Sequence, residues 1–61
     1  MIEVKFFDKT GIGMSSNSGY GKDIETAILD LVGGDETLVT KYAKAYEKKD
    51  FSNCKYLLDK I

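Results

Sequence analysis

The sequence predicts an α+β fold in which a short N-terminal β-hairpin is followed by three short α-helices. Two observations lead to this prediction. Residues 2–7 alternate between apolar and polar side chains, and the apolar residues after position 23 recur with helical spacing. A chain of 61 residues is expected to form one small domain, and such domains bury only about 60% of the surface that the unfolded chain exposes. Stability is therefore expected to be marginal.

The β-hairpin is expected over residues 2–15. Apolar side chains share one face of its first strand: Ile2, Val4 and Phe6. Phe7 points to the opposite face. The segment Asp8–Gly11 is expected to turn the chain, because Asp favours the first position of a turn and Gly accepts a positive φ. Residues 12–15 then form the return strand.

Residues 15–22 are small and polar, and are expected to form a loop that presents Tyr20. This loop partly matches a phosphate-binding loop, since Gly21-Lys22 is present before an expected helix. However, Ser16 occupies the position of the first glycine, and Asp23 occupies the position of the Ser or Thr that holds magnesium. A carboxylate there also disfavours phosphate binding. We therefore expect a connecting or partner-contacting loop and no nucleotide cofactor.

Helices are expected at about residues 23–32, 35–48 and 50–61. An aspartate precedes each of them as a candidate N-cap: Asp23, Asp35 and Asp50. Each segment carries apolar residues at spacings of three and four, which places them on one face of a helix. Gly33-Gly34 is expected to end the first helix.

Residues 39–61 carry small and aromatic side chains at regular spacing. The positions are Val39, Tyr42, Ala43 and Tyr46, then Asp50-Phe51, then Cys54, Leu58 and Ile61. This pattern resembles a single tetratricopeptide-type helical hairpin, with Asp50-Phe51 at its turn and Cys54 at the small-residue position of its second helix. The resemblance implies two antiparallel helices packed through small residues. It does not imply peptide binding in a groove, because such solenoids need about three repeats.

Catalytic and metal-binding chemistry is disfavoured by the composition. The chain has no His and one Cys, so it can form neither an intramolecular disulfide nor a structural zinc site. Cys54 falls on the apolar side of the third expected helix, and buried structural thiols are inert. The carboxylates are spread over expected helix ends and exposed faces. The sequence thus predicts a protein that is not an enzyme and has no cofactor or metal.

The charged residues also restrict the class of partner. All nine basic residues are Lys, against ten acidic residues. Arg is the preferred side chain for recognising phosphate and guanine, so nucleic acid is disfavoured. The chain shows neither a signal peptide nor an apolar run long enough to span a membrane. We therefore expect no membrane contact and a cytoplasmic location, in a bacterium or in the host of a phage.

The functional hypothesis is a small protein-binding module that inhibits or modulates a larger protein. Small size and Lys-only basicity are typical of phage-encoded proteins that act on a host enzyme or a defence system. Contacts with the partner are expected at exposed aromatic and basic positions: Phe7, Tyr20, Lys41, Lys44 and Tyr56.

A homodimer is also expected, since strand 2–7 has an unpaired edge and Phe7 lies off its covered face.

Two alternatives remain open from the sequence. The first is a small helix-turn-helix-like DNA-binding regulator built on the helices that flank Gly33-Gly34. Its candidate DNA-facing residues are Thr37, Thr40, Lys41 and Lys44. The second is a structural subunit that forms a higher-order homo-oligomer.

Overall fold

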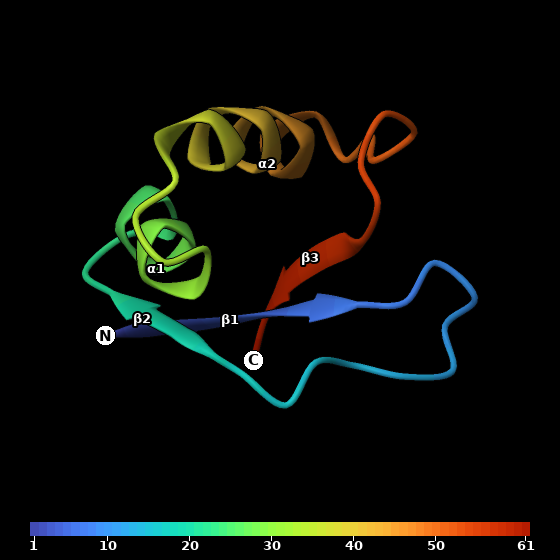
Figure 1. The fold of residues 1–61 in the computed structure, drawn as a ribbon, viewed down its shortest axis with the longest axis horizontal. Coiled ribbons are helices and arrows are strands. Elements are labelled where there is room, and N and C mark those ends of the chain that lie inside the picture. Colours follow the sequence, from blue (N-terminus) through green and yellow to red (C-terminus); the bar gives the residue numbers. More distant parts are fainter.

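The computed structural model describes residues 1–61 as a three-stranded antiparallel sheet with two helices on one face (Figure 1). The elements are β1 (Ile2–Phe7), β2 (Gly19–Gly21), α1 (Ile24–Leu31), α2 (Glu36–Lys48) and β3 (Leu57–Lys60). The strand order is β2-β1-β3, so the N-terminal strand is the central one. The predicted α+β class is confirmed, whereas the prediction of three helices is wrong.

The core lies between the sheet and the helices. Its buried hydrophobic residues come from all elements except β2, and from the turn before β3: Val4, Ala27, Ile28, Tyr42, Ala45, Cys54 and Leu58. Ile2 and Phe6 of β1 pack against this cluster beside Val4. Because side chains alternate along a strand, Phe7 points to the face that the helices leave open. The predicted division of β1 into two faces is therefore correct.

The chain after β1 turns as predicted but returns differently. The Gly11 N–H donates to the Asp8 carbonyl at 2.9 Å, and Gly11 has a φ of 78°. The predicted return strand over residues 12–15 is reduced to a single bridge, between Phe7 and Met14. The second strand forms instead at residues 19–21, within the segment predicted as a loop. It forms there because its two glycines let α1 lie directly on its backbone.

Both helices begin at the predicted aspartates. The Asp23 carboxylate accepts from the Thr26 N–H at 2.8 Å. The Asp35 carboxylate accepts from the N–H groups of Thr37 and Leu38 at 3.1 and 3.3 Å. These bonds satisfy backbone donors that no helical carbonyl can reach, which is why the helices start there.

The predicted third helix over residues 50–61 is wrong. The Asp50 carboxylate accepts from the Ser52 N–H at 3.1 Å, and the Cys54 N–H donates to the Phe51 carbonyl at 2.9 Å, so the segment begins as a turn. The chain then forms β3, which places Leu58 opposite Phe6 of β1. The second helix that the tetratricopeptide resemblance implied is therefore a turn and a strand. A short apolar segment can form either a helix or a strand. Here it forms a strand, because the backbone groups on this side of β1 need hydrogen-bond partners.

Three aspartates in turns and at a helix start should make stability depend on pH. Backbone N–H groups bond to the carboxylates of Asp8, Asp23 and Asp50 and lower their pKa below the usual 3.8. Their contribution to stability is therefore complete above the unfolded pKa and is lost as the pH falls through the lower folded pKa. We expect the urea midpoint to stay level from about pH 7 to about pH 5 and to fall below about pH 4.

The matched variant for this pH prediction replaces all three residues, as Asp8→Asn, Asp23→Asn and Asp50→Asn. Asn keeps the capping geometry but does not titrate, so the decline in acid should be shallower than in the wild type. Equal declines in the two proteins would show that other carboxylates cause the acid sensitivity.

Candidate partner-binding surface

On each outer edge of the sheet, one backbone N–H is bonded to a carboxylate. On the outer side of β2, the Tyr20 N–H donates to Asp30 Oδ2 of α1 at 2.9 Å. On β3, the Lys60 N–H donates to Asp59 Oδ1 at 2.8 Å. β1 itself is bonded on both sides, to β2 and to β3. The unpaired edge on strand 2–7, which was one reason to expect a dimer, is therefore absent. These bonds occupy one outward backbone donor on β2 and one on β3, which weakens pairing of these edges with another strand.

An apolar hollow of about 370 Å³ lies beside Phe7, next to Met14, which bridges to Phe7. It is lined by Phe6, Phe7, Asp8, Gly13, Met14, Ser15 and Tyr56. The ring of Phe6 supports it, with centroids 4.8 Å from Tyr42 and 5.5 Å from Tyr56. Met14 is 60% exposed and Tyr56 is 39% exposed. The structure thus brings Phe7 and Tyr56, two of the predicted contact residues, into one site.

Tyr56 is held in this site by the core. The Tyr56 N–H donates to the Tyr42 hydroxyl at 3.4 Å. Burial raises the pKa of that hydroxyl above its usual 10.0, so it stays neutral in ordinary buffers. The hydroxyl therefore acts as a positioning group for the backbone at Tyr56.

A second apolar hollow, of about 360 Å³, lies on the β3 side of Phe7. Its apolar lining is Phe7, Tyr46, Phe51, Leu57 and Leu58, and its polar lining is Asp8, Gly11, Lys49 and Asp59. The Lys49 ammonium lies 4.1 Å from the ring centroid of Tyr46. The two hollows share Phe7 and Asp8. We call their apolar lining the Phe7 surface: Phe6, Phe7, Met14, Tyr46, Phe51, Tyr56, Leu57 and Leu58.

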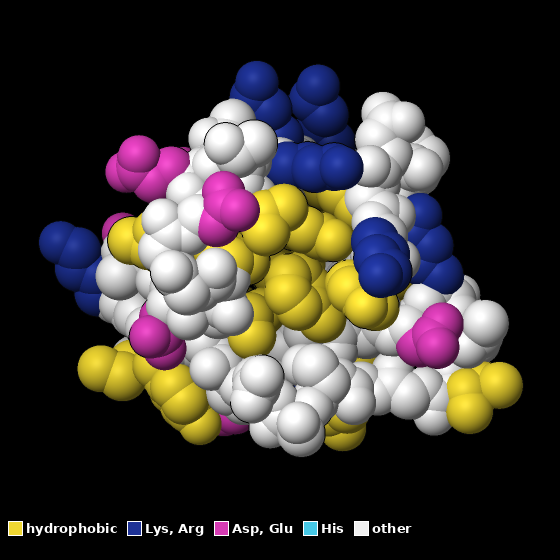
Figure 2. Space-filling model, in the orientation of Figure 1, with side chains coloured by type: hydrophobic (Ala, Val, Ile, Leu, Met, Phe, Trp, Pro, Cys, Tyr) yellow, Lys and Arg dark blue, Asp and Glu magenta, His cyan; other side chains and the backbone are white.

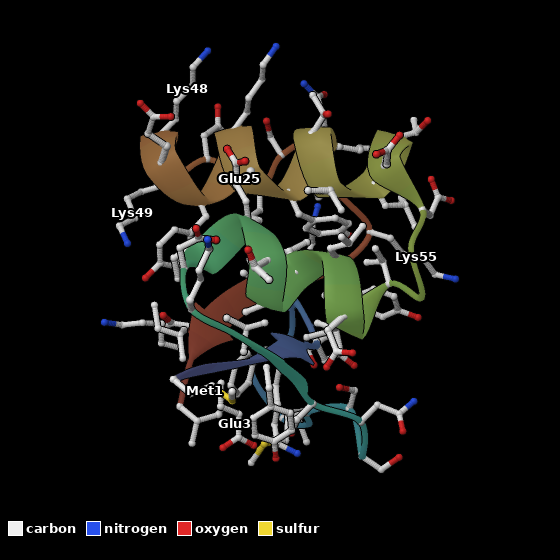
Figure 3. The ribbon with its side chains drawn as sticks, turned by 90° about the vertical axis from the view of Figure 1, so that its left-hand side faces the viewer. Met1, Glu3, Glu25, Lys48, Lys49 and Lys55 are labelled. Atoms are coloured by element: carbon white, nitrogen blue, oxygen red, sulfur yellow. The ribbon has the colours of Figure 1, made fainter.

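Tyr20 lies apart from the Phe7 surface. It pairs with Glu3 across the sheet, four residues before Phe7, which corresponds to about 13 Å along β1. The Tyr20 hydroxyl donates to Glu3 Oε2 at 3.2 Å, and Ser18 Oγ donates to the same oxygen at 2.6 Å. Figure 3 shows Glu3 on the face of the sheet away from the helices. Tyr20 therefore belongs to a polar cluster on the open sheet face.

Lys41 and Lys44 lie on a third part of the surface. They line a groove of about 240 Å³ between α2 and the turn that follows it, together with Ala45, Lys48, Asp50, Asn53 and Cys54. Figure 2 shows lysine side chains gathered over α2 and beside that turn. The five contact residues predicted from the sequence are thus divided among three places, of which one combines Phe7 with Tyr56.

Sequence reasoning missed several residues of the Phe7 surface. Met14 could have been found, because a hairpin turned at Asp8–Gly11 brings the residue opposite Phe7 into a fixed register. Phe51 and Leu57 could not, because their positions depend on β3, which the apolar spacing predicts as part of a helix.

The structure contains no group of three or more His, Cys, Asp or Glu side chains placed to hold a metal ion. Neither helix has the length and apolarity that crossing a membrane requires. Fold and surface together define a small α+β chain with two apolar hollows that share Phe7 and Asp8, and a lysine-lined groove between α2 and the turn that follows it. Comparison with protein-family models, curated proteins and solved structures finds no match.

Proposed function

We propose that this chain is a non-enzymatic protein-binding module that inhibits or modulates a larger protein through the Phe7 surface. The observation that supports this is the pair of hollows, about 370 and 360 Å³, that meet at Phe7. Binding energy in protein interfaces concentrates where a few apolar or aromatic side chains enter well-packed pockets. Two adjacent hollows suit two such side chains from one partner.

The surroundings of the hollows also suit an interface. Charged residues border them, namely Asp8, Lys49 and Asp59. An apolar centre with a polar rim is the usual anatomy of a protein interface. A standard interface buries about 800 Å² on each partner, which is about a fifth of the 4202 Å² surface of this chain. An interface of that size would let this chain act by covering part of a larger target.

The variant Phe7→Ser tests this proposal, because Phe7 forms a wall of both hollows. Immobilised wild-type protein should recover one stoichiometric partner from a bacterial lysate. Phe7→Ser should weaken binding of that partner by at least about tenfold, as expected for an interface anchor. Leu29→Ser is the matched control, because Leu29 is an exposed leucine on α1 that lines neither hollow.

Phe7 is half-buried, so its replacement could also destabilise the fold. A second variant, Met14→Ser, separates the two effects, because Met14 is mostly exposed and lines the first hollow. Met14→Ser should keep the wild-type circular dichroism spectrum and still weaken binding. If both variants recover the partner as well as the wild type does, the Phe7 surface is not the binding site.

Self-association is a second use of the same surface. The homodimer expected from the sequence would form through the Phe7 surface, where the apolar hollows lie. Light scattering on a sizing column should then give twice the monomer mass for the wild type and a lower mass for Phe7→Ser. A monomeric wild type would reject the homodimer and leave the Phe7 surface free for a different protein.

A further inference from the structure

Three lysines of α2 form one wall of the groove that the following turn closes. Lys41, Lys44 and Lys48 fall within about 60° around the helix axis, because a helix has 3.6 residues per turn. The groove also contacts the buried residues Ala45 and Cys54. Figure 3 shows Lys48 pointing away from the sheet, into solvent. The three ammonium groups are thus presented together on one side of the molecule.

The groove carries a net positive charge. Its one carboxylate belongs to Asp50 and accepts a hydrogen bond from the Ser52 N–H at 3.1 Å. That bond lowers the pKa of Asp50, so the carboxylate remains charged but is already bonded within the turn. The groove therefore contains three lysine ammonium groups and one carboxylate. Five of the ten acidic residues lie in residues 23–40, which contain no lysine: Asp23, Glu25, Asp30, Asp35 and Glu36.

We propose that this groove binds an acidic α-helix of a partner protein. Lys44 and Lys48 lie about 4.5 and about 10.5 Å from Lys41 along the axis of α2, at a rise of 1.5 Å per residue. A partner helix with Glu at positions i, i+3 and i+7 repeats this spacing, because its rise is the same. Two helices in parallel alignment then carry opposite charges at matching heights along their axes, and the complementary potentials also speed their encounter.

The charge distribution favours an acidic protein helix over nucleic acid. A DNA duplex carries one negative charge per 1.7 Å along its axis, so it would extend well beyond a groove with three lysines. The chain has a net charge of −1, and its acidic residues 23–36 would then face further phosphates. A short acidic helix needs only the three lysines of the groove.

The test uses a fluorescein-labelled synthetic helical peptide with Glu at positions i, i+3 and i+7, and a matched peptide with Gln at these positions. Fluorescence polarisation at about 20 mM salt, where charges are weakly screened, should show binding of the Glu peptide. The Gln peptide should bind at least about tenfold more weakly. Raising the salt to about 200 mM should reduce binding of the Glu peptide.

Two charge-reversal variants provide the controls. Lys41→Glu with Lys44→Glu should reduce binding of the Glu peptide by at least about tenfold. Lys22→Glu with Lys60→Glu changes the net charge equally but lies outside the groove, and should leave binding within about twofold. All four lysines are exposed, so neither pair should disturb folding.

Three results would overturn this inference: no binding of the Glu peptide at low salt, equal loss in the two double variants, or tighter binding of a DNA duplex than of the Glu peptide. The last would assign the groove to nucleic acid. Phe7→Ser should bind the Glu peptide like the wild type, because Phe7 does not line the groove. The lysine groove and the Phe7 surface are therefore tested independently.

Discussion

Gly21→Ala is expected to lower the free energy of unfolding by at least about 3 kcal/mol, because no side chain fits between β2 and α1. A Cβ at Gly21 would meet the backbone nitrogen of Ala27 and would lie 2.7 Å from the carbonyl carbon of Thr26. These are backbone atoms of α1, which cannot rotate aside as the end of a flexible side chain can. The helix would have to move off the strand.

The same argument holds for Gly19, where a Cβ would lie 2.6 Å from the Cβ of Leu31 and 2.7 Å from its backbone nitrogen. At about 0.05–0.15 kcal/mol per residue, a chain of this length has a total stability of only about 3–9 kcal/mol. A loss of about 3 kcal/mol at Gly21 should therefore remove at least about a third of this stability. Urea unfolding followed by circular dichroism measures the loss.

Gly13→Ala is the control for the Gly21 prediction. A Cβ at Gly13 would meet no atom within 4 Å, and Gly13 does not have a positive φ, so alanine should fit without strain. The effect of this substitution should stay within about 0.5 kcal/mol. If Gly21→Ala is as stable as Gly13→Ala, then α1 does not lie on β2 as closely as described.

Ile28→Ala should have the second-largest effect, a loss of about 3 kcal/mol within the 2–5 kcal/mol range for such truncations. Ile28 is fully buried at the centre of the core, together with Val4 of β1. Truncation removes apolar contacts and leaves a cavity that the backbone of α1 cannot close, because the glycines of β2 already hold it in contact. Thermal or urea unfolding provides the measurement.

Leu29→Ala is the matched control for Ile28, since it removes a similar side chain from the next position of α1. Leu29 is 38% exposed, and its truncation should cost less than about 1 kcal/mol. Equal losses in the two variants would show that α1 does not present Ile28 to the core.

The candidate sites could be predicted in part. Phe7 was identifiable because it breaks the alternation of β1, and Lys41 and Lys44 because they share a helical face. That Tyr56 meets Phe7 in one hollow could not be predicted, because their contact depends on β3 pairing with β1. The hydrogen bond from Tyr20 to Glu3 could not be predicted either, because the small polar residues around β2 are typical of a loop.

The sequence by itself determined β1, the turn at Asp8–Gly11 and the two helices that start at Asp23 and Asp35. Each depends on interactions within a few residues: alternation, a side chain bonded to nearby backbone, or apolar spacing. Only the tertiary structure decided that residues 19–21 and 57–60 are strands. Strand pairing joins residues far apart in the chain, such as Phe6 and Leu58. The spacing of apolar residues within one segment therefore does not predict it.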